Sequence, residues 1–452
     1  MNTRSPGRER CPWSRLIDRV MNGTFSVQSR TRFPSRSSRA SPDQAIQCLG
    51  PARDRETAMK LKQSPEDFQV EELTDVVPEP EGAFAFYRLE KTGWTTPDAL
   101  SQVRRRWQVS PGRLSFGGLK DRHARTTQFL TIHRGPQRNL SQQNIVVTYL
   151  GQVRQPYGSQ SIRGNRFRIV LRSLSEAESE RALALVPELR QVGVPNYFDD
   201  QRFGSVSGEQ FIGKLLVEGK FEQALKLALT AEYEYDRAEQ KREKEILTAS
   251  WGDWSSLKEK LPRGHCRSLV DYLRVHPGDF RGALERLRPE LRALYLSAWQ
   301  SHLWNRMLAR FVEQTIPAEH LLRLSLRLGE LPFPRGLTVP GLEMLKSARL
   351  PLPSARLRRP EGDPGRELAR AVLAEEGLTL EQMKVRGSRE LFFSRGDRPA
   401  LIIPADLQAE VSDDERHLGR KKLLLSFELP RGAYATLIVK RIQQADFTPG
   451  CA

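Results

Sequence analysis

The chain has 452 residues, of which 38% are hydrophobic, enough for two domains with sizeable cores. Its 72 Lys and Arg against 55 Asp and Glu give a net charge of +17, which favours a polyanionic partner such as RNA or DNA, although an arginine-rich solvated surface would have the same composition. The sequence excludes a membrane span, since no apolar run approaches roughly 18 residues, and its four separated cysteines indicate neither a disulfide framework nor a zinc ribbon but a reducing compartment.

Residues 1–58 differ in composition from the rest of the chain. They contain 11 Arg, no Lys, many Ser and no sustained hydrophobic period, which predicts a disordered tail. Their five acidic residues and weak amphipathicity argue against an organelle transit peptide. We favour a third interpretation, in which translation starts at Met59.

From Met59 the pattern is that of a folded α+β protein. FQVEEL and FAFYRLEK alternate apolar and polar residues, as half-buried strands do. TTPDALSQVRRRW predicts a helix with Thr96 as N-cap and Pro97 at the first helical position.

FGGLKDRHARTTQFLTI, residues 116–132, places a charged loop between segments that read as strands. Asp121 stands between Lys120 and Arg122, and two cationic neighbours favour an ionised carboxylate at neutral pH.

NRFRIVLRSL predicts a strand with Arg166, Arg168 and Arg172 on one face. That face suits either the wall of an RNA groove or a solvent-facing edge strand. Ser175 and Glu178 then form a capping box for the next helix.

The segment from about Gln201 to Leu407 is more helical. It contains an exposed helix, YEYDRAEQKREKEIL, and a helix whose apolar positions predict core: Leu296, Trp299, Leu303 and Met307. KLLLSFEL, PRG and AYATLIVKRI predict a β-hairpin from Lys422 to Ile442.

Common catalytic motifs are missing from the sequence. The seven histidines show no HxH or HExxH spacing, so no metal is expected. There is no GxSxG elbow, phosphate-binding loop or Rossmann glycine fingerprint. The RGD tripeptide at residues 395–397 is too short to indicate a function.

Several longer motifs, however, resemble one family, the TruD family of tRNA pseudouridine synthases, in the right order over essentially the whole chain from Met59 onward. The motifs are KLKQSPEDFQVEE, LEKTGWTT, FGGLKDRHARTTQ, GNRFRIVLR, VPNYFDDQRFG, LYLSAWQSHLWN, LTVPG and LPRGAYATLIVKRI.

The resemblance implies an α+β fold. A pseudouridine synthase-type catalytic domain with a mixed, mainly antiparallel sheet would comprise residues 59–208 and 408–446, interrupted by an inserted TRUD-type domain of residues 209–407. The implied function is isomerisation of a specific uridine of tRNA, at position 13, by a monomeric cytoplasmic enzyme. The reaction would need no metal and no other cofactor.

The resemblance also assigns roles to individual residues. Asp121 would be the catalytic carboxylate, acting on the uracil ring, on the sugar, or as a base that gives a glycal. Phe68 and Tyr434 would line the uridine pocket, Asn196 would contact the Watson–Crick edge, and Lys62 would be a basic pocket residue. Without the family, Phe68 and Tyr434 would be read as strand core and Asn196 as a turn residue.

Two other functions stay open at this point. A non-catalytic RNA-binding protein or chaperone would explain the charge but not the combination of Asp121, Asn196 and Lys62. An RNA hydrolase with Asp121 as general base would want a second catalytic group, for which His123 is the only nearby candidate.

Removing residues 1–58 should leave folding and turnover nearly unchanged, because the tail has no hydrophobic pattern and the family motifs begin after it. Nonspecific RNA binding at low salt should weaken, since the tail carries 11 Arg against 5 acidic residues, a net +6. Assays of the truncated protein with unmodified tRNA check both expectations. Aggregation, or loss of most turnover at moderate salt, would refute them.

Overall fold

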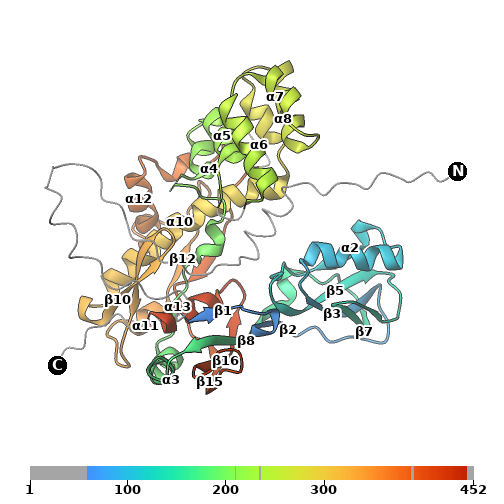
Figure 1. Cartoon of the computed structure of the whole chain (residues 1–452). Helices are drawn as coiled ribbons and strands as arrows, with labels where there is room; N and C mark the ends of the chain where they lie inside the picture. The colour runs from blue at the N-terminus through green and yellow to red at the C-terminus, as the bar shows by residue number, and fades with distance from the viewer. Residues whose placement is uncertain (1–58, 209, 234–235, 388–390, 445–452) are drawn as a thin grey trace. The chain divides into compact units, whose positions relative to one another are not determined.

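The computed structural model describes residues 59–208, 210–233, 236–387 and 391–444, so the predicted tail of residues 1–58 lies outside the described part (Figure 1). The described chain divides into two compact units. The sheet unit comprises residues 59–190, 404–431 and 439–444, and the helical unit comprises residues 191–403 and 432–438. The domain limits implied by the family resemblance, at residues 208 and 408, stay a prediction.

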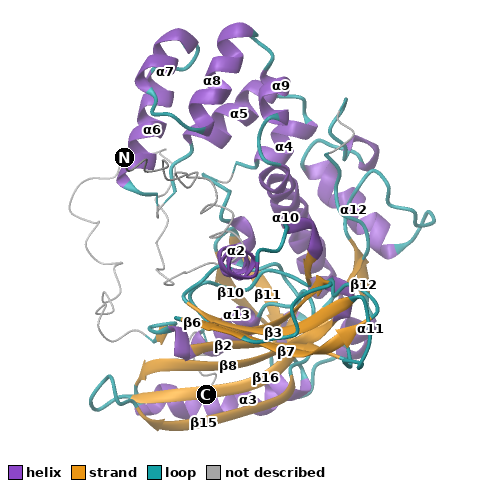
Figure 2. Cartoon of the chain, turned by 90° about the vertical axis from the view of Figure 1, so that its right-hand side faces the viewer, coloured by secondary structure: helices purple, strands orange, loops and turns teal. Residues whose placement is uncertain are grey.

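A ten-stranded sheet dominates the sheet unit, with the order β15-β16-β8-β2-β5-β3-β7-β6 (Figure 2). In addition, β1 pairs with β8 and β4 with β5. Among the described strand pairs β2–β5 is parallel and the others are antiparallel, which confirms the mixed, mainly antiparallel sheet of an α+β fold. The strands are β1 (Lys60–Leu61), β2 (Phe68–Thr74), β3 (Phe84–Thr92), β4 (Leu114–Phe116), β5 (Arg125–His133), β6 (Leu140–Gln142), β7 (Ile145–Val153), β8 (Ile162–Leu174), β15 (Ala405–Asp413) and β16 (Lys421–Pro430).

Helix α2 (Thr96–Trp107) covers one face of β3, β5 and β7 (Figure 1). Its buried residues Ala99, Leu100 and Val103 recur at helical spacing and pack on side chains from those strands. The predicted N-cap was wrong by one residue. Thr95 is the cap and accepts a hydrogen bond from the Asp98 N–H (3.1 Å), so the Thr96 hydroxyl is left for another partner.

Strand β8 lies inside the sheet, between β16 and β2, so the edge-strand alternative was wrong. Arg166 is half-exposed and pairs with Glu428 and Glu71, whereas Arg172 is buried. The helix that follows, α3 (Glu176–Gln191), begins with the predicted capping box: the Glu178 N–H donates to Ser175 Oγ (3.2 Å) and the Ser175 N–H to Glu178 (2.7 Å).

The predicted C-terminal hairpin was wrong in its second half. KLLLSFEL is strand β16, but it pairs with β15 and β8, and AYATLIVKRI contains helix α13 (Ala435–Gln443). The β-branched run of this segment favours a strand by propensity. Leu437, Ile438, Val439 and Ile442 are all buried, so the segment is an apolar helix enclosed by protein, which periodicity cannot distinguish from a buried strand.

The helical unit is built around the long helix α10 (Pro289–Thr315), whose Leu296, Trp299, Leu303 and Met307 are buried as predicted. The segment predicted to be an exposed helix covers most of α6, whose residues are mostly exposed or half-buried. The other helices are α4 (Ile212–Val217), α5 (Phe221–Thr230), α6 (Ala238–Ala249), α7 (Trp254–Lys260), α8 (His265–Val275), α9 (Phe280–Glu285), α11 (Leu342–Ser347) and α12 (Pro364–Glu375). Short strand pairs are β9 (Val194–Pro195) with β14 (Leu401–Ile402), β10 (Leu321–Leu326) with β11 (Gly329–Pro334), and β12 (Arg349–Pro351) with β13 (Asp397–Pro399).

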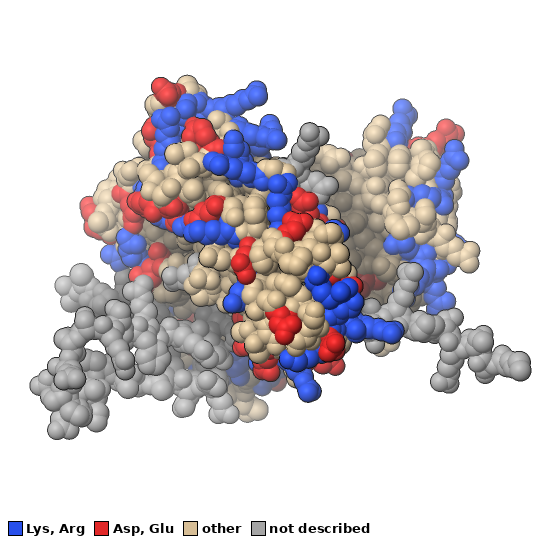
Figure 3. Space-filling view, turned by 90° about the horizontal axis from the view of Figure 1, so that it is seen from above, with Lys and Arg blue, Asp and Glu red and all other residues tan. Residues whose placement is uncertain are grey.

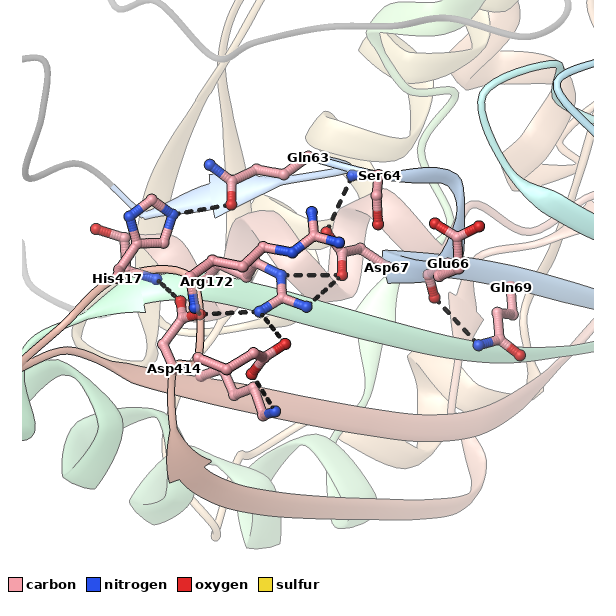
Figure 4. A network of polar contacts seen from close by, with 12 residues as sticks. Gln63, Ser64, Glu66, Asp67, Gln69, Arg172, Asp414 and His417 are labelled. Carbon is pink, nitrogen blue, oxygen red and sulfur yellow. Dashed lines mark hydrogen bonds and ion pairs between the residues drawn. The ribbon is translucent and has the colours of Figure 1, made fainter.

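A buried ion-pair network joins three parts of the sheet unit (Figure 4). Arg172 on β8 contacts Asp67, in the short helix between β1 and β2, at 2.8 Å, and Asp414, after β15, at 2.9 Å. Burial by itself would raise the pKa of Asp414, but hydrogen bonds from the Arg416 and Ser173 N–H groups and from Arg172 outweigh it and lower the pKa. These hydrogen bonds therefore favour the ionised form of Asp414.

Arg172→Met should lower the free energy of unfolding by about 3 kcal/mol, because it leaves two buried carboxylates without their cation. Arg166→Met on the same strand is the matched control and should cost less than about 1 kcal/mol, since its ion pairs are half-exposed. The gap in unfolding free energy between the two variants should narrow as the pH falls below about 4, because the carboxyl of Asp414 is then protonated in the unfolded chain, while its lowered pKa keeps it ionised where Arg172 is present. Urea unfolding at pH 7 and pH 3.5 measures these differences, and equal costs at pH 7 would contradict the assignment.

Candidate active site

Asp121 lies in the loop that connects β4 to β5 in the sheet unit. The loop begins with Gly117, where a Cβ atom would lie 2.5 Å from Cδ1 of Ile162 on β8, so a larger residue would have to push the isoleucine side chain aside. The backbone of the loop is then fixed by side chains from β3, α2 and β5.

Lys91 on β3, the first of these side chains, is buried, with 1% of its surface exposed. Its Nζ donates to the carbonyl oxygens of Trp94 (2.7 Å), Lys120 (3.3 Å) and Asp121 (2.9 Å). Burial lowers the pKa of Lys91 to about 7, with Asp121 acting in the opposite direction. A buried amine of this kind sits directly beneath the backbone of the predicted catalytic residue.

Thr96 and Gln128 complete the support of the loop. The Lys120 N–H donates to the Thr96 hydroxyl (3.0 Å), and that hydroxyl donates to Gln128 Oε1 (2.8 Å). Gln128 Nε2 in turn donates to the Gly118 carbonyl (3.2 Å). These contacts give a structural reason for the Thr-Thr of LEKTGWTT and for the Gln of ARTTQ.

The carboxylate of Asp121 forms an ion pair with the ammonium of Lys62, and both side chains are mostly buried, with exposed fractions of 10% and 6%. The other oxygen, Oδ1, accepts a hydrogen bond from the His123 N–H (2.8 Å). The cationic partner expected next in the chain, Lys120, does not contact this carboxylate. Its ammonium pairs instead with the buried Glu72 (2.8 Å) and donates to Asn165 (2.6 Å).

Lys62 reaches Asp121 from an unusual backbone conformation. Its φ is 58°, in the left-handed region that favours glycine, so the surrounding structure must hold it there. On its N-terminal side Leu61 pairs with β8, and on its C-terminal side the Gln63 side chain contacts His417 (Figure 4). Strain of this kind is typical of functional positions.

Phe68 lies beneath the Lys62 ammonium, which is 4.0 Å from the centroid of its ring. The ring is buried and packs edge to face on Phe167 at 6.3 Å. The structure therefore brings Lys62, Phe68 and Asp121 together. It gives Phe68 a cation–π contact with Lys62, while stacking on a base stays a prediction.

Asn196 and Tyr434, the other two predicted site residues, belong to the helical unit. Asn196 is buried; its Nδ2 donates to the Pro399 carbonyl (3.1 Å), and its Oδ1 accepts a hydrogen bond from Arg398 (2.8 Å). The half-buried Tyr434 packs edge to face on Phe198, at 6.2 Å between ring centroids.

Phe198 in turn is clamped through its backbone by Asn305 on α10, which accepts a hydrogen bond from its N–H (2.8 Å) and donates to its carbonyl (2.8 Å). These two hydrogen bonds give a structural reason for Asn305, the Asn of LYLSAWQSHLWN.

The sequence did not predict the residues that support the site, which are Lys91, Thr96, Gln128, Glu72 and Arg398. A lysine in an alternating strand and threonines at a helix start read as surface and cap, so only the long-range contacts reveal them.

Two classes of feature are missing from the described residues. No group of three or more His, Cys, Asp or Glu side chains there could hold a metal ion. Nor is any helix of that part of the chain long and apolar enough to cross a membrane.

The low pKa of Lys91 predicts a pH-dependent stability. The folded pKa, about 7, lies below the ordinary value of 10.5, so the unfolded chain binds more protons between these values and stability rises with pH. Compared with Lys91→Met, the wild-type protein should gain roughly 2 kcal/mol of unfolding free energy between pH 7 and pH 9. Urea unfolding of both proteins at several pH values measures this gain, and a difference that stays flat or falls would contradict it.

Comparison with known proteins gives one consistent result. The model of the family "tRNA pseudouridine synthase D (TruD)" matches residues 52–323 and 345–442. A curated relative from Methanococcus maripaludis, named "Probable tRNA pseudouridine synthase D 1", is 30% identical over 393 residues, which are 85% of this chain and 99% of the relative. The tRNA pseudouridine synthase D of Leptospira interrogans is 29% identical over 404 residues, 84% of this chain and 95% of its own.

Among solved structures, that of the TruD protein of Methanosarcina mazei superimposes with a TM-score of 0.64 at 30% identity, covering 86% of this chain and 93% of the other. The sequence match and the structural match thus extend over most of both partners. The chain belongs to the TruD family of tRNA pseudouridine synthases.

Proposed function

We propose that this protein isomerises a specific uridine of tRNA, the one at position 13, to pseudouridine, with Asp121 as the catalytic carboxylate. The observation that carries the proposal is the contact between the Asp121 carboxylate and the Lys62 ammonium on a loop whose backbone is fixed from below. An ion pair that is mostly buried, and one of whose members, Lys62, has a strained backbone, is costly to maintain for structure alone. Such a pair is typical of a reactive site.

The chemistry requires one ionised carboxylate. The bond from the sugar to the ring nitrogen must break, the uracil must turn, and a bond from the sugar to a ring carbon must form. Asp121 can contribute by adding to the ring, by adding to the sugar, or by removing a sugar proton to give a glycal. Each route uses the same carboxylate and needs neither a metal nor a redox cofactor.

The other predicted residues have roles in holding the uridine. Lys62 would orient the carboxylate, and Phe68 would close the pocket beneath it. Asn196 would recognise the uracil edge, since its amide retains one N–H and one oxygen lone pair beyond the contacts to Pro399 and Arg398. Tyr434 would stack on the flipped base.

The alternative functions are less well supported. A non-catalytic RNA-binding protein gains nothing from a carboxylate fixed among cations, since it would repel phosphates. In a hydrolase, His123 would have to act with Asp121. His123 is exposed, and its backbone N–H donates a hydrogen bond to the Asp121 carboxylate.

The same function implies a substrate, an oligomeric state and a compartment. The partner would be tRNA, the enzyme would act as a monomer without a small-molecule cofactor, and the compartment would be the cytoplasm. The net charge of +17 supports a polyanionic substrate.

Asp121→Asn tests the catalytic assignment. The amide preserves shape and much of the polar contact but removes the reacting charge, so single-turnover pseudouridine formation should fall by at least ~1000-fold, about 4 kcal/mol of barrier. The affinity for tRNA should change far less, because binding is spread over many phosphate and base contacts. The measurement is chemical detection of pseudouridine in an unmodified tRNA transcript, with the strand checked for cleavage.

Asp75→Asn is the matched control, because Asp75 is an exposed aspartate of the same unit, with its carboxylate 3.9 Å from Arg163. It should retain wild-type turnover. If Asp121 is only a structural partner of Lys62, the Asn variant should melt at a lower temperature and lose binding and turnover together. A folded Asp121→Asn protein within tenfold of the wild-type rate would end the catalytic assignment, and cleavage of the tRNA strand would favour the hydrolase.

A further inference from the structure

The large positive charge of the chain does not by itself mark an RNA contact. On the face shown in Figure 3, Lys and Arg side chains lie among Asp and Glu side chains, and many of the cations in the described chain are paired with carboxylates. A contact site for a phosphate is better sought where a guanidinium is partly buried and has no carboxylate partner. Arg202 and Arg398 of the helical unit meet that description and lie against the same aromatic ring.

Arg202 and Arg398 both lie against the ring of Phe198. The guanidinium carbon of Arg398 is 4.0 Å from the ring centroid and 5.2 Å from that of Trp304, and the guanidinium carbon of Arg202 is 5.3 Å from the Phe198 centroid. Arg202 follows Phe198 in the family motif VPNYFDDQRFG, and Arg398 comes directly after the RGD tripeptide. We call these two residues the arginine pair.

Neither guanidinium of the arginine pair is neutralised within the part of the chain that the structure describes. Arg202 donates to the Ser297 hydroxyl (3.4 Å), and its Nε is buried with no hydrogen-bond partner. Among the described residues Arg398 donates to Asn196 alone, and the two guanidinium groups repel each other. Burial lowers the pKa of Arg398 to about 10, which still leaves it charged at neutral pH.

The contacts of Arg398 hold the guanidinium in place and leave part of it available. Its Nε and Nη2 donate to the Asn196 carbonyl (3.2 and 3.0 Å), and Nη2 also donates to Asn196 Oδ1 (2.8 Å). The remaining nitrogen, Nη1, faces the turn at Gly432, where a Cβ atom would lie 3.3 Å from it. The guanidinium is planar and held at Nε and Nη2, and no hydrogen bond of Nη1 is found among the described residues, so Nη1 is well suited to a phosphate oxygen.

The turn at Gly432 leads to Tyr434, and the helical unit anchors it through a hydrogen bond between the Thr436 hydroxyl and Asp199. The arginine pair therefore lies among the residues proposed to hold the uridine, Asn196 and Tyr434. A positive charge without a counter-ion is unfavourable in a partly buried site, and an anion supplied by the substrate would remove that cost.

We propose that Arg202 and Arg398 bind the sugar–phosphate backbone of the RNA beside the target uridine. This inference rests on the proposed function, because RNA is the ligand that function implies. The arginine pair would position the strand through charge, while Asn196 reads the base. Lysine could replace the charge of Arg398 but not its simultaneous hold on Asn196.

The test is the salt dependence of the affinity of the full-length protein for an unmodified tRNA transcript. Arg398→Gln and Arg202→Gln should each reduce the slope of log affinity against log salt by about 1, and should weaken binding about tenfold at low salt. Arg323→Gln is the matched control: it removes the same charge from the same unit, but Arg323 already pairs with Glu313 at 2.5 Å. Its slope should stay close to that of the wild type.

Arg398→Lys separates the contribution of Arg398 to RNA binding from its role in positioning Asn196. It should keep the wild-type slope but lower the rate of pseudouridine formation, because Asn196 loses its planar partner. If Arg398→Gln and Arg202→Gln both keep the wild-type slope, the arginine pair is a structural support of Asn196 and Phe198, and the inference is overturned. Should Arg398→Gln fail to fold, Arg202→Gln and Arg398→Lys still decide the question.

The readout also separates this inference from the proposed function. Slopes report RNA contacts whether or not the bound uridine reacts. Reduced slopes with no pseudouridine from the wild-type protein would refute the proposed function and retain the RNA contact. Pseudouridine formation by the wild-type protein, with slopes of the arginine variants that match the wild type, would support the proposed function and refute the RNA contact.

Discussion

The position of Asp121 depends on an ammonium group buried beneath its backbone. Lys91 has three donors, and three carbonyl oxygens accept them, two of which belong to Lys120 and Asp121. Taking this lysine out of water is unfavourable, as its lowered pKa shows, but its loss would leave buried carbonyls without partners. Together with Thr96, it keeps the main chain of the loop in place, so that the Asp121 side chain is presented from a rigid base.

The other half of the ion pair has a separate support. Lys62 follows the short strand β1, and the helical turn after it ends at Asp67, which Arg172 holds from β8 (Figure 4). That arginine also holds Asp414, so strand β8 connects the segment with Lys62 to the C-terminal part of the sheet. A left-handed backbone at a lysine can persist only under such constraints. The two members of the pair are thus positioned by different strands, β3 for Asp121 and β8 for Lys62.

Sequence patterns were sufficient for strands β2, β3 and β8 and for the buried face of α10, because these segments have clear periodicity. They failed for α13, whose buried β-branched residues give no period, and for the Thr95 cap, which an adjacent threonine obscured. The family motifs grouped Lys62 with Asp121, and the structure places the two side chains in contact. The supports of the site were not predictable, since Lys91 and Arg398 act on residues far along the chain and neither has a local signal.

Both units fix a loop with a cation that donates to main-chain carbonyls instead of pairing with a carboxylate. Lys91 does so for the loop of Asp121, and Arg398 does so for Asn196. A carboxylate that paired with Lys91 or Arg398 could have ordered either loop equally well, but it would have cancelled the positive charge of that side chain. Carbonyl oxygens satisfy the donors and leave the positive charge in place, for Arg398 at neutral pH and for Lys91 below its pKa of about 7. Where the ligand is a polyanion, a site built in this way is ordered before binding and keeps the positive potential that attracts the ligand.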